Sequence, residues 1–268
     1  MAQARVREVT ARRAAALGRI PPPIRGISIE LLALLGGVAI WEALGWLLGL
    51  SWLPPFSRVV AALFQLIGSG AIVSNLLASL RALLIGFGFS LVVGVLVGSL
   101  MARYRRVELA LDVYVNAMLF APAIVFAPIF FTLFGLSEIT RIAVVVLYAL
   151  FVIIINTFTG IRAVDGALVE MARSFGAGER QILFRILLPA SLPVLFAGIR
   201  LGMGRAVRGM INGEMFIAFV GLGALAQKYG SQFDASRVLA ISLVVIIVAL
   251  VADWIVQAID RRLTRWAG

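Results

Sequence analysis

The segment Ile161–Pro189 reads IRAVDGALVEMARSFGAGERQILFRILLP and lies between two long apolar runs. Its first half repeats apolar residues every three or four positions, which is typical of one face of a helix; these residues are Ile161, Val164, Leu168, Met171 and Phe175. Gly176-Ala177-Gly178 then predicts a sharp turn, because glycine adopts the backbone conformations that a turn requires. We expect a second short helix from Glu179, with Pro189 marking the start of the next apolar run. The predicted helix–turn–helix has an apolar ridge with a charged rim, a shape that docks into a groove on a partner.

Six apolar runs surround this loop, whose full extent we take as 160–191. Each is long enough to cross a bilayer, which takes about 20 mainly apolar residues in a helix. The runs are Ile29–Leu50, Asn75–Met101, Leu109–Phe134, Ile139–Thr159, Leu192–Phe219 and Val238–Ile259. Long uninterrupted runs indicate helices, because the strands of a membrane barrel are short and alternate in polarity. We therefore predict an all-α membrane protein with about six transmembrane helices, in which a domain of residues 28–268 follows a basic tail of residues 1–27.

The composition agrees with this class. Hydrophobic residues make up 62% of the 268 residues and charged residues 14%, whereas soluble domains have about 45–50% and about 25%. The net charge is +11, yet the arginines do not gather on one basic domain, so we do not expect a nucleic-acid partner. They lie in short segments between apolar runs. With the N-terminus inside, sixteen of the 24 arginines and lysines lie on the inner side and five on the outer side. This bias predicts a multi-pass protein with both termini in the cytoplasm.

The chain has neither cysteine nor histidine. Thiolate ligands and the commonest catalytic base and metal ligand are therefore excluded. The sequence also has no Gly-x-x-x-x-Gly-Lys-Ser/Thr phosphate loop. We expect no catalytic residue, no metal site and no cofactor in this chain.

The central loop carries a recognisable spacing. It reads Glu170-Met171-Ala172, three residues, Gly176, nine residues, and then Ile186, one residue, Leu188 and Pro189. This pattern resembles the "EAA" signature of permease subunits of ATP-binding cassette importers. Met171 stands where that signature has its first alanine, which replaces one good helix former with another.

Further motifs resemble one subgroup of that family, the permeases for nitrate, sulfonates, taurine and bicarbonate. Leu53–Val59 is similar to the subgroup's Leu-Pro-Pro-Pro-Ser-Arg-Val stretch, with Phe56 in place of the third proline. The other matching stretches are Trp41-Glu42, Asn156-Thr157, Gly160–Arg162 and Leu188–Pro193.

The resemblance implies a type I importer fold and a defined set of partners. A second permease copy, expected to be identical, would complete the pore. A cytoplasmic ATPase pair, which binds ATP and Mg, would grip the loops, and a periplasmic or lipid-anchored solute-binding protein would deliver the solute. The coupling residues would be Glu170, Met171, Ala172, Gly176, Ile186, Leu188 and Pro189. The solute would be a small anion such as a sulfonate, taurine, nitrate, bicarbonate or a small organic acid.

The fifth apolar run contains Arg205, Arg208 and Asn212 near the middle of the membrane. At about 100° per residue these three side chains fall within one sector of a helix. Arginine is costly in lipid, so we expect the sector to line a water-filled path, where guanidinium groups bind anionic oxygens. Alternatively, these arginines pair with Glu42 or Glu214 and only hold helices together.

Three other features of the apolar runs bear on structure and function. The ridge Gly86, Ser90, Gly94 and Gly98 predicts close helix packing. Pro122 and Pro128 predict bends in the third run. Glu42, Glu214 and Asp253 are acidic residues within apolar runs, as in the proton relay of a secondary transporter. A stand-alone transporter or channel is therefore the competing interpretation, and a structural assembly factor is a third.

Overall fold

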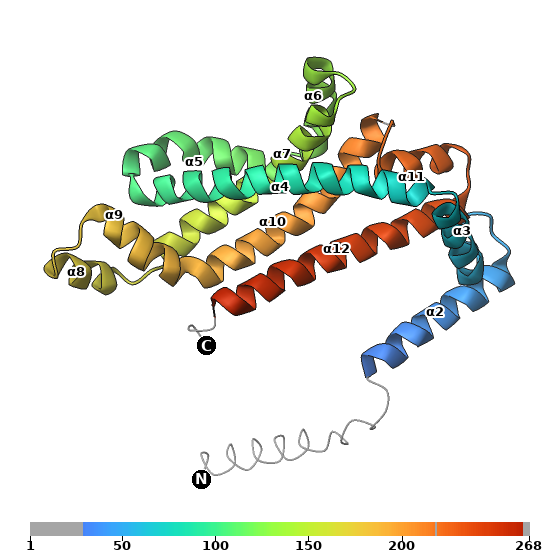
Figure 1. Ribbon diagram of the computed structural model, residues 1–268, viewed down its shortest axis with the longest axis horizontal. Helices are drawn as coiled ribbons and strands as arrows, with labels where there is room; N and C mark the ends of the chain where they lie inside the picture. Colours follow the sequence, from blue (N-terminus) through green and yellow to red (C-terminus); the bar gives the residue numbers. More distant parts are fainter. Residues whose placement is uncertain (1–28, 218, 265–268) are drawn as a thin grey trace, which may run out of the picture. The chain divides into compact units, whose positions relative to one another are not determined.

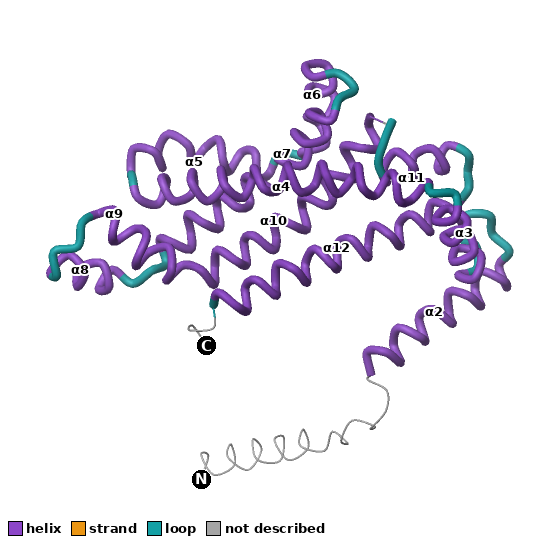
Figure 2. The backbone as a smooth tube through the Cα atoms, in the orientation of Figure 1, coloured by secondary structure: helices purple, strands orange, loops and turns teal. Residues whose placement is uncertain are grey.

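A computed structural model describes residues 29–217 and 219–264 of the chain. In these residues the backbone forms helices and no strands (Figures 1 and 2). The helices are α2 (Ile29–Leu48), α3 (Phe56–Gly68), α4 (Ala71–Arg103), α5 (Arg105–Phe120), the 3-10 helix η1 (Ala123–Phe126), α6 (Ala127–Phe134), α7 (Glu138–Arg162), α8 (Gly166–Ser174), α9 (Glu179–Ile182), the π-helix η2 (Leu183–Leu187), α10 (Leu188–Ile217), α11 (Leu222–Ser231) and α12 (Ala235–Leu263). The chain divides into two compact units, residues 1–58 and 59–268. The predicted basic tail, residues 1–27, lies outside the described residues.

Five helical stretches of the described chain are long and apolar enough to cross a membrane: α2, α4, α7, α9 to α10 and α12. Helix α5 and the following η1–α6 pair make a sixth if they are taken as one broken span. The predicted all-α membrane fold with about six spans is thus confirmed.

The third span differs from the prediction of a bent but continuous helix. Helix α5 ends at Phe120, and the chain turns by 99° before α6 continues to Phe134. Ala121 and Pro122 have extended backbone, which a helix cannot contain. Pro128 does not bend a helix at all, because it lies in the first turn of α6, where its missing N–H is not needed.

The start of the fifth span also differs from the prediction. We expected a separate short helix from Glu179 that stops before Pro189, yet one helix runs from Glu179 to Phe216. The wider π turn of η2 lies just before the proline, and the Leu188 N–H reaches back to the Leu183 carbonyl. Proline clashes with the carbonyl four residues earlier in an α-helix; a π turn changes that spacing, so the helix passes through the proline.

In the second unit, α7 packs between α4 and α10. The predicted small-residue ridge of α4 faces α7: a Cβ atom at Gly86 would lie 2.7 Å from Val145, and one at Gly94 would lie 2.7 Å from Ile153. Ile153 also meets Gly202 of α10, where a Cβ atom would lie 2.8 Å from Ile153 Cγ1. The close packing that the ridge predicted is confirmed, and α10 repeats it on the other side of α7.

In the first unit, hydrogen bonds join the Trp41-Glu42 pair to the segment that contains Pro54 and Ser57. Trp41 donates its indole N–H to the Pro54 carbonyl at 3.0 Å. Glu42 accepts hydrogen bonds from the Ser57 N–H at 2.9 Å, the Ser57 hydroxyl at 2.8 Å and the Trp46 indole at 2.8 Å. Within this unit the partners of Glu42 are therefore Ser57 and Trp46.

Candidate functional site

The loop between α7 and α10 contains α8, and both ends of this helix are set by its sequence. Asp165 caps its start, since its carboxylate accepts the Ala167 N–H at 2.9 Å. At the other end, the Ala177 N–H bonds to the Ala172 carbonyl at 3.0 Å and the Gly176 N–H to the Arg173 carbonyl at 2.9 Å. This is a Schellman turn, and Gly176 holds its left-handed position with φ of +79°. The turn predicted from Gly176 is therefore present.

One face of α8 has no partner within the described chain. Met171 is 53% exposed and Phe175, just after the helix, is 86% exposed. Glu170 is also exposed, whereas Ala172 is buried. Large apolar side chains at three- and four-residue spacing on an open helix face are suited to docking in a groove.

The second half of the motif lies elsewhere in the fold. Ile186 belongs to the π turn η2, while Leu188 and Pro189 begin α10; all three are half-buried. Helix α8 packs against η2. The seven predicted coupling residues thus extend from the open face of α8 into the start of a long membrane helix.

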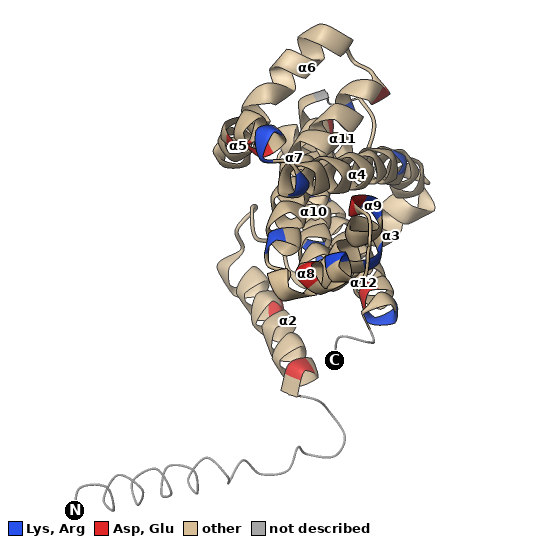
Figure 3. Cartoon of the chain, turned by 90° about the vertical axis from the view of Figure 1, so that its left-hand side faces the viewer, with Lys and Arg blue, Asp and Glu red and all other residues tan. Residues whose placement is uncertain are grey.

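Ion pairs join α8 to the rest of the second unit. Glu179, at the start of α9, binds Arg173 of α8 at 3.2 Å and also binds Arg103 at the end of α4. Figure 3, which looks onto the end of the unit that carries α8 and α9, shows basic and acidic residues close to both helices. Glu179 thus links the end of α8 to the end of α4 through two ion pairs.

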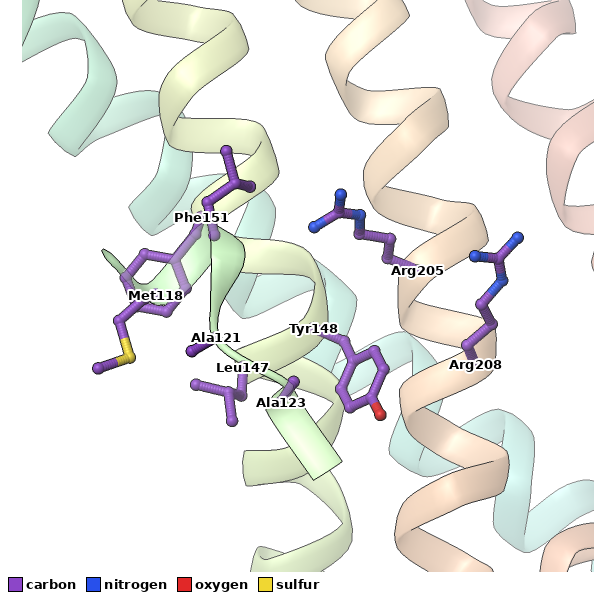
Figure 4. A pocket seen from close by; sticks show the side chains of 9 residues that line it. Met118, Ala121, Ala123, Leu147, Tyr148, Phe151, Arg205 and Arg208 are labelled. Atoms are coloured by element: carbon purple, nitrogen blue, oxygen red, sulfur yellow. The ribbon is translucent and has the colours of Figure 1, made fainter. Parts of the chain in front are cut away.

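A pocket of about 230 Å³ lies between α5, the break after it, α7 and α10. Its lining residues are Met118, Leu119, Ala121, Ala123, Leu147, Tyr148, Phe151, Arg205 and Arg208 (Figure 4). The two arginines project from α10 on one side, and Met118, Leu147 and Phe151 stand on the other (Figure 4). Non-helical backbone within a membrane is tolerated where it lines a cavity, and the break at Ala121 does so.

Two of the three polar residues predicted on the fifth span line this pocket, and the third bonds to a residue of its lining. Arg205 and Arg208 both line it, and the Asn212 side-chain amide donates to the Tyr148 hydroxyl at 2.8 Å. Sequence reasoning missed Tyr148. It packs closely against Gly209 of α10, where a Cβ atom would lie 2.9 Å from the Tyr148 ring, and this contact between two helices has no local signal in the sequence.

The arginines of α10 differ in their partners. Arg200 is neutralised by Asp253 of α12, with 2.7 Å from Nε to Oδ1. Arg205 and Arg208 make no ion pair or hydrogen bond with any residue of the described chain. Within the second unit, the suggested pairing of these two arginines with Glu214 is not formed, because Glu214 is held by Ser79, Gly223 and Arg141.

Glu214 is fully buried and fastens α11 to its neighbours. Its Oε2 atom accepts the Ser79 hydroxyl at 2.8 Å and the Gly223 N–H at 3.0 Å, and Ser79 in turn accepts the Leu222 N–H at 2.9 Å. Arg141 approaches Oε1 at 4.0 Å. Glu214 and Asp253 are thus engaged in helix-to-helix contacts, which argues against their serving as successive stations of a proton relay. Within residues 29–217 and 219–264 no acidic cluster is suited to a metal ion.

Residues 90–265 match the family described as binding-protein-dependent transport system inner membrane component. The chain belongs to this family. The matched range includes α8, the pocket and the whole of α7, α10 and α12.

Individual relatives of this inner membrane component differ in the solutes that their names give. The putative aliphatic sulfonates transport permease of Bacillus subtilis is 31% identical over 85% of this chain and 84% of its own length. The riboflavin transport system permease of Chloroflexus aurantiacus is 32% identical over 95% of this chain and 94% of its own. The sulfonate relative agrees with the subgroup that the motifs indicated. The riboflavin relative shows that sequence similarity alone does not identify the solute.

The fold of this family member matches a solved one. An inward-facing structure of the MetNI methionine ABC transporter superposes with a TM-score of 0.64, covering 72% of this chain and 96% of that chain at 20% identity. At this identity the likeness shows the type I permease fold alone.

Proposed function

We propose that this chain is the permease subunit of an ATP-driven, binding-protein-dependent importer for a small anion. It would lie in a bacterial cytoplasmic membrane, with both termini in the cytoplasm, and would have no enzymatic activity. Family membership supports the importer. The observation that carries the mechanism is the open apolar face of α8, displayed by the Schellman turn at Gly176.

In this proposal α8 is the coupling helix. Met171 and Phe175 insert into a groove of the ATPase, and Glu170 meets a complementary charge there. Ala172 and Gly176 fix the helix and its turn, and Ile186, Leu188 and Pro189 continue directly into α10. Closure of the ATPase pair therefore moves α8 and α10 as one rigid body, which alternates access to the central path.

The proposal assigns the remaining tasks to partners. ATP and Mg bind to the cytoplasmic ATPase pair, and a periplasmic or lipid-anchored protein delivers the solute. A second copy of this permease, surrounded like the first by lipid, completes the path. Nucleic acid has no part in it.

Arg205, Arg208 and Asn212 line the solute path in this proposal, joined by Tyr148. An arginine at mid-membrane costs about 2.5–3.5 kcal/mol on insertion scales. Arg205 and Arg208 have no carboxylate within the described chain to offset that cost, unlike Arg200. Water and a passing anion in the pocket supply the missing partners.

Docking of α8 is tested by cross-linking. The chain lacks cysteine, so Met171→Cys and Phe175→Cys each introduce one thiol on the open face. With its ATPase co-expressed, each variant should form a cross-link to that ATPase through a short bifunctional reagent. Leu77→Cys, whose exposure of 64% lies between those of Met171 and Phe175 but which is on α4, is the control and should form none. Equal cross-linking of all three, or of none, would remove the docking role.

The path is tested by charge removal. Arg208→Gln and Asn212→Ala should slow solute uptake by the reconstituted importer while assembly and basal ATP hydrolysis stay near normal. The double variant Arg200→Gln/Asp253→Asn removes a neighbouring charge pair and should transport normally. If Arg208→Gln prevents assembly, the arginine pairs with the second copy and is structural.

A further inference from the structure

The polar side chains that line the α5–α7–α10 pocket are mainly hydrogen-bond donors. Arg205 and Arg208 carry only donors. Tyr148 is already an acceptor for the Asn212 amide at 2.8 Å, which leaves its hydroxyl hydrogen free to donate. No carboxylate, side-chain amide or histidine is among the lining residues. A solute with its own N–H or O–H groups would find no side-chain acceptor here, whereas an ionised sulfonate or carboxylate finds three sets of donors.

The wall opposite the arginines is apolar. Met118, Leu147 and Phe151 form it together with the alanines of the helix break (Figure 4). A small inorganic anion such as nitrate has nothing to place against this wall. An alkyl or aryl group bonded to the anionic head would cover this wall and would itself be removed from water.

We propose that this pocket binds monoanions that bear an apolar group, such as alkanesulfonates and short carboxylates, in preference to zwitterions and inorganic anions. The proposal rests on the proposed function, since it names the solute class for the path assigned there. The two guanidinium groups repel the ammonium group of a zwitterion, and no acidic residue lines the pocket to receive it. Tyr148 is the specificity-determining residue that the sequence did not reveal, because its hydroxyl is held by Asn212 of α10 and keeps its own hydrogen for the anion.

The sharpest comparison is between 1-propanesulfonate and taurine. Both have the same length and the same sulfonate, and a methyl group in one replaces the ammonium group of the other. Binding of each is measured by calorimetry on the purified permease–ATPase complex without the binding protein, whose own selectivity would otherwise dominate. We expect 1-propanesulfonate to bind at least tenfold more tightly than taurine.

A chain-length series tests the apolar wall. From methanesulfonate upward, each buried methylene should tighten binding about fourfold until the pocket is full. In Phe151→Ala, the gain in affinity with each added methylene should become smaller. Tyr148→Phe should lower the affinity for every sulfonate about tenfold. The Arg200→Gln/Asp253→Asn variant should bind the sulfonates with the affinity of the natural chain. The alcohol 1-pentanol, which has the tail without the charge, should not bind.

Three results would overturn the proposal: taurine binding as tightly as 1-propanesulfonate, nitrate or methanesulfonate binding as tightly as the longer sulfonates, or no binding of any sulfonate. The proposed function is judged separately. The same preparation, reconstituted with the binding protein, either performs ATP-dependent uptake or does not, whichever anion the isolated pocket accepts.

Discussion

Gly202→Ala tests the packing of α7 between its two glycine-lined neighbours. The added Cβ atom would lie 2.8 Å from Ile153 Cγ1 and 3.1 Å from Ile153 Cδ1, whereas carbon atoms in contact lie at about 3.5–4.0 Å. Overpacking of this kind costs about 1–3 kcal/mol. The better helix propensity of alanine returns about 0.5–1 kcal/mol. We therefore expect a net loss of stability of about 1–2 kcal/mol.

The chain offers a control two residues away. A Cβ atom at Gly204 meets nothing within 4 Å, so Gly204→Ala should be neutral or slightly stabilising. Stability is measured as the midpoint of unfolding when a denaturing detergent is titrated into the purified complex. A net loss of about 1.4 kcal/mol corresponds to a tenfold shift in the unfolding equilibrium.

Ile153→Ala should rescue Gly202→Ala, because it removes both clashing atoms. It should rescue Gly94→Ala less completely, since there the clash involves the Ile153 Cβ atom, which alanine retains at 2.9 Å. The double variants are compared with the sum of the single effects. If Gly202→Ala and Gly204→Ala behave alike, or if Ile153→Ala gives Gly202→Ala no rescue, the packing argument is refuted.

Three further predictions concern the coupling turn, the topology and the buried hydroxyl. Gly176→Val should insert normally but lose solute-stimulated ATP hydrolysis, because a β-branched residue is strained at φ of +79°; Gly178→Val, at φ of −74°, is the matched control and should keep it. Gly178→Cys should react with an impermeant thiol reagent in inverted vesicles only, and labelling of intact cells would reverse the topology. Ser79→Ala should lower the unfolding midpoint by the equivalent of about 1–3 kcal/mol, since it leaves the buried Leu222 N–H and one bond of Glu214 unmatched; an unchanged midpoint would contradict that role.

Much of the fold and part of the site were predictable from the sequence. Hydrophobic run length is a direct consequence of bilayer thickness, so the spans were found with errors of a few residues, except that the fifth begins at Glu179 and not at Leu192. Gly176 predicted its turn because few other residues adopt that backbone conformation. The sector of Arg205, Arg208 and Asn212 follows from helix periodicity alone; Arg205 and Arg208 line one pocket, and Asn212 bonds to Tyr148 of its lining.

The errors concern proline and contacts between helices. Pro122 lies in a 99° break, whereas Pro189 is passed by a continuous helix. Both prolines lie beside apolar segments. Whether the helix breaks or continues at the proline depends on whether the neighbouring turn can adopt π-helical geometry. Tyr148 was missed because its importance arises from α7 meeting α10, which no local pattern in either helix specifies.

The central claim is that this chain moves its solute only with energy from a partner ATPase. The direct measurement uses proteoliposomes and a radiolabelled solute that the binding protein retains. Uptake is compared for the chain with its ATPase, internal ATP and binding protein, for the same system lacking ATP, and for the chain alone under a proton gradient. The account predicts uptake in the first case alone, and gradient-driven uptake by the chain alone would contradict it.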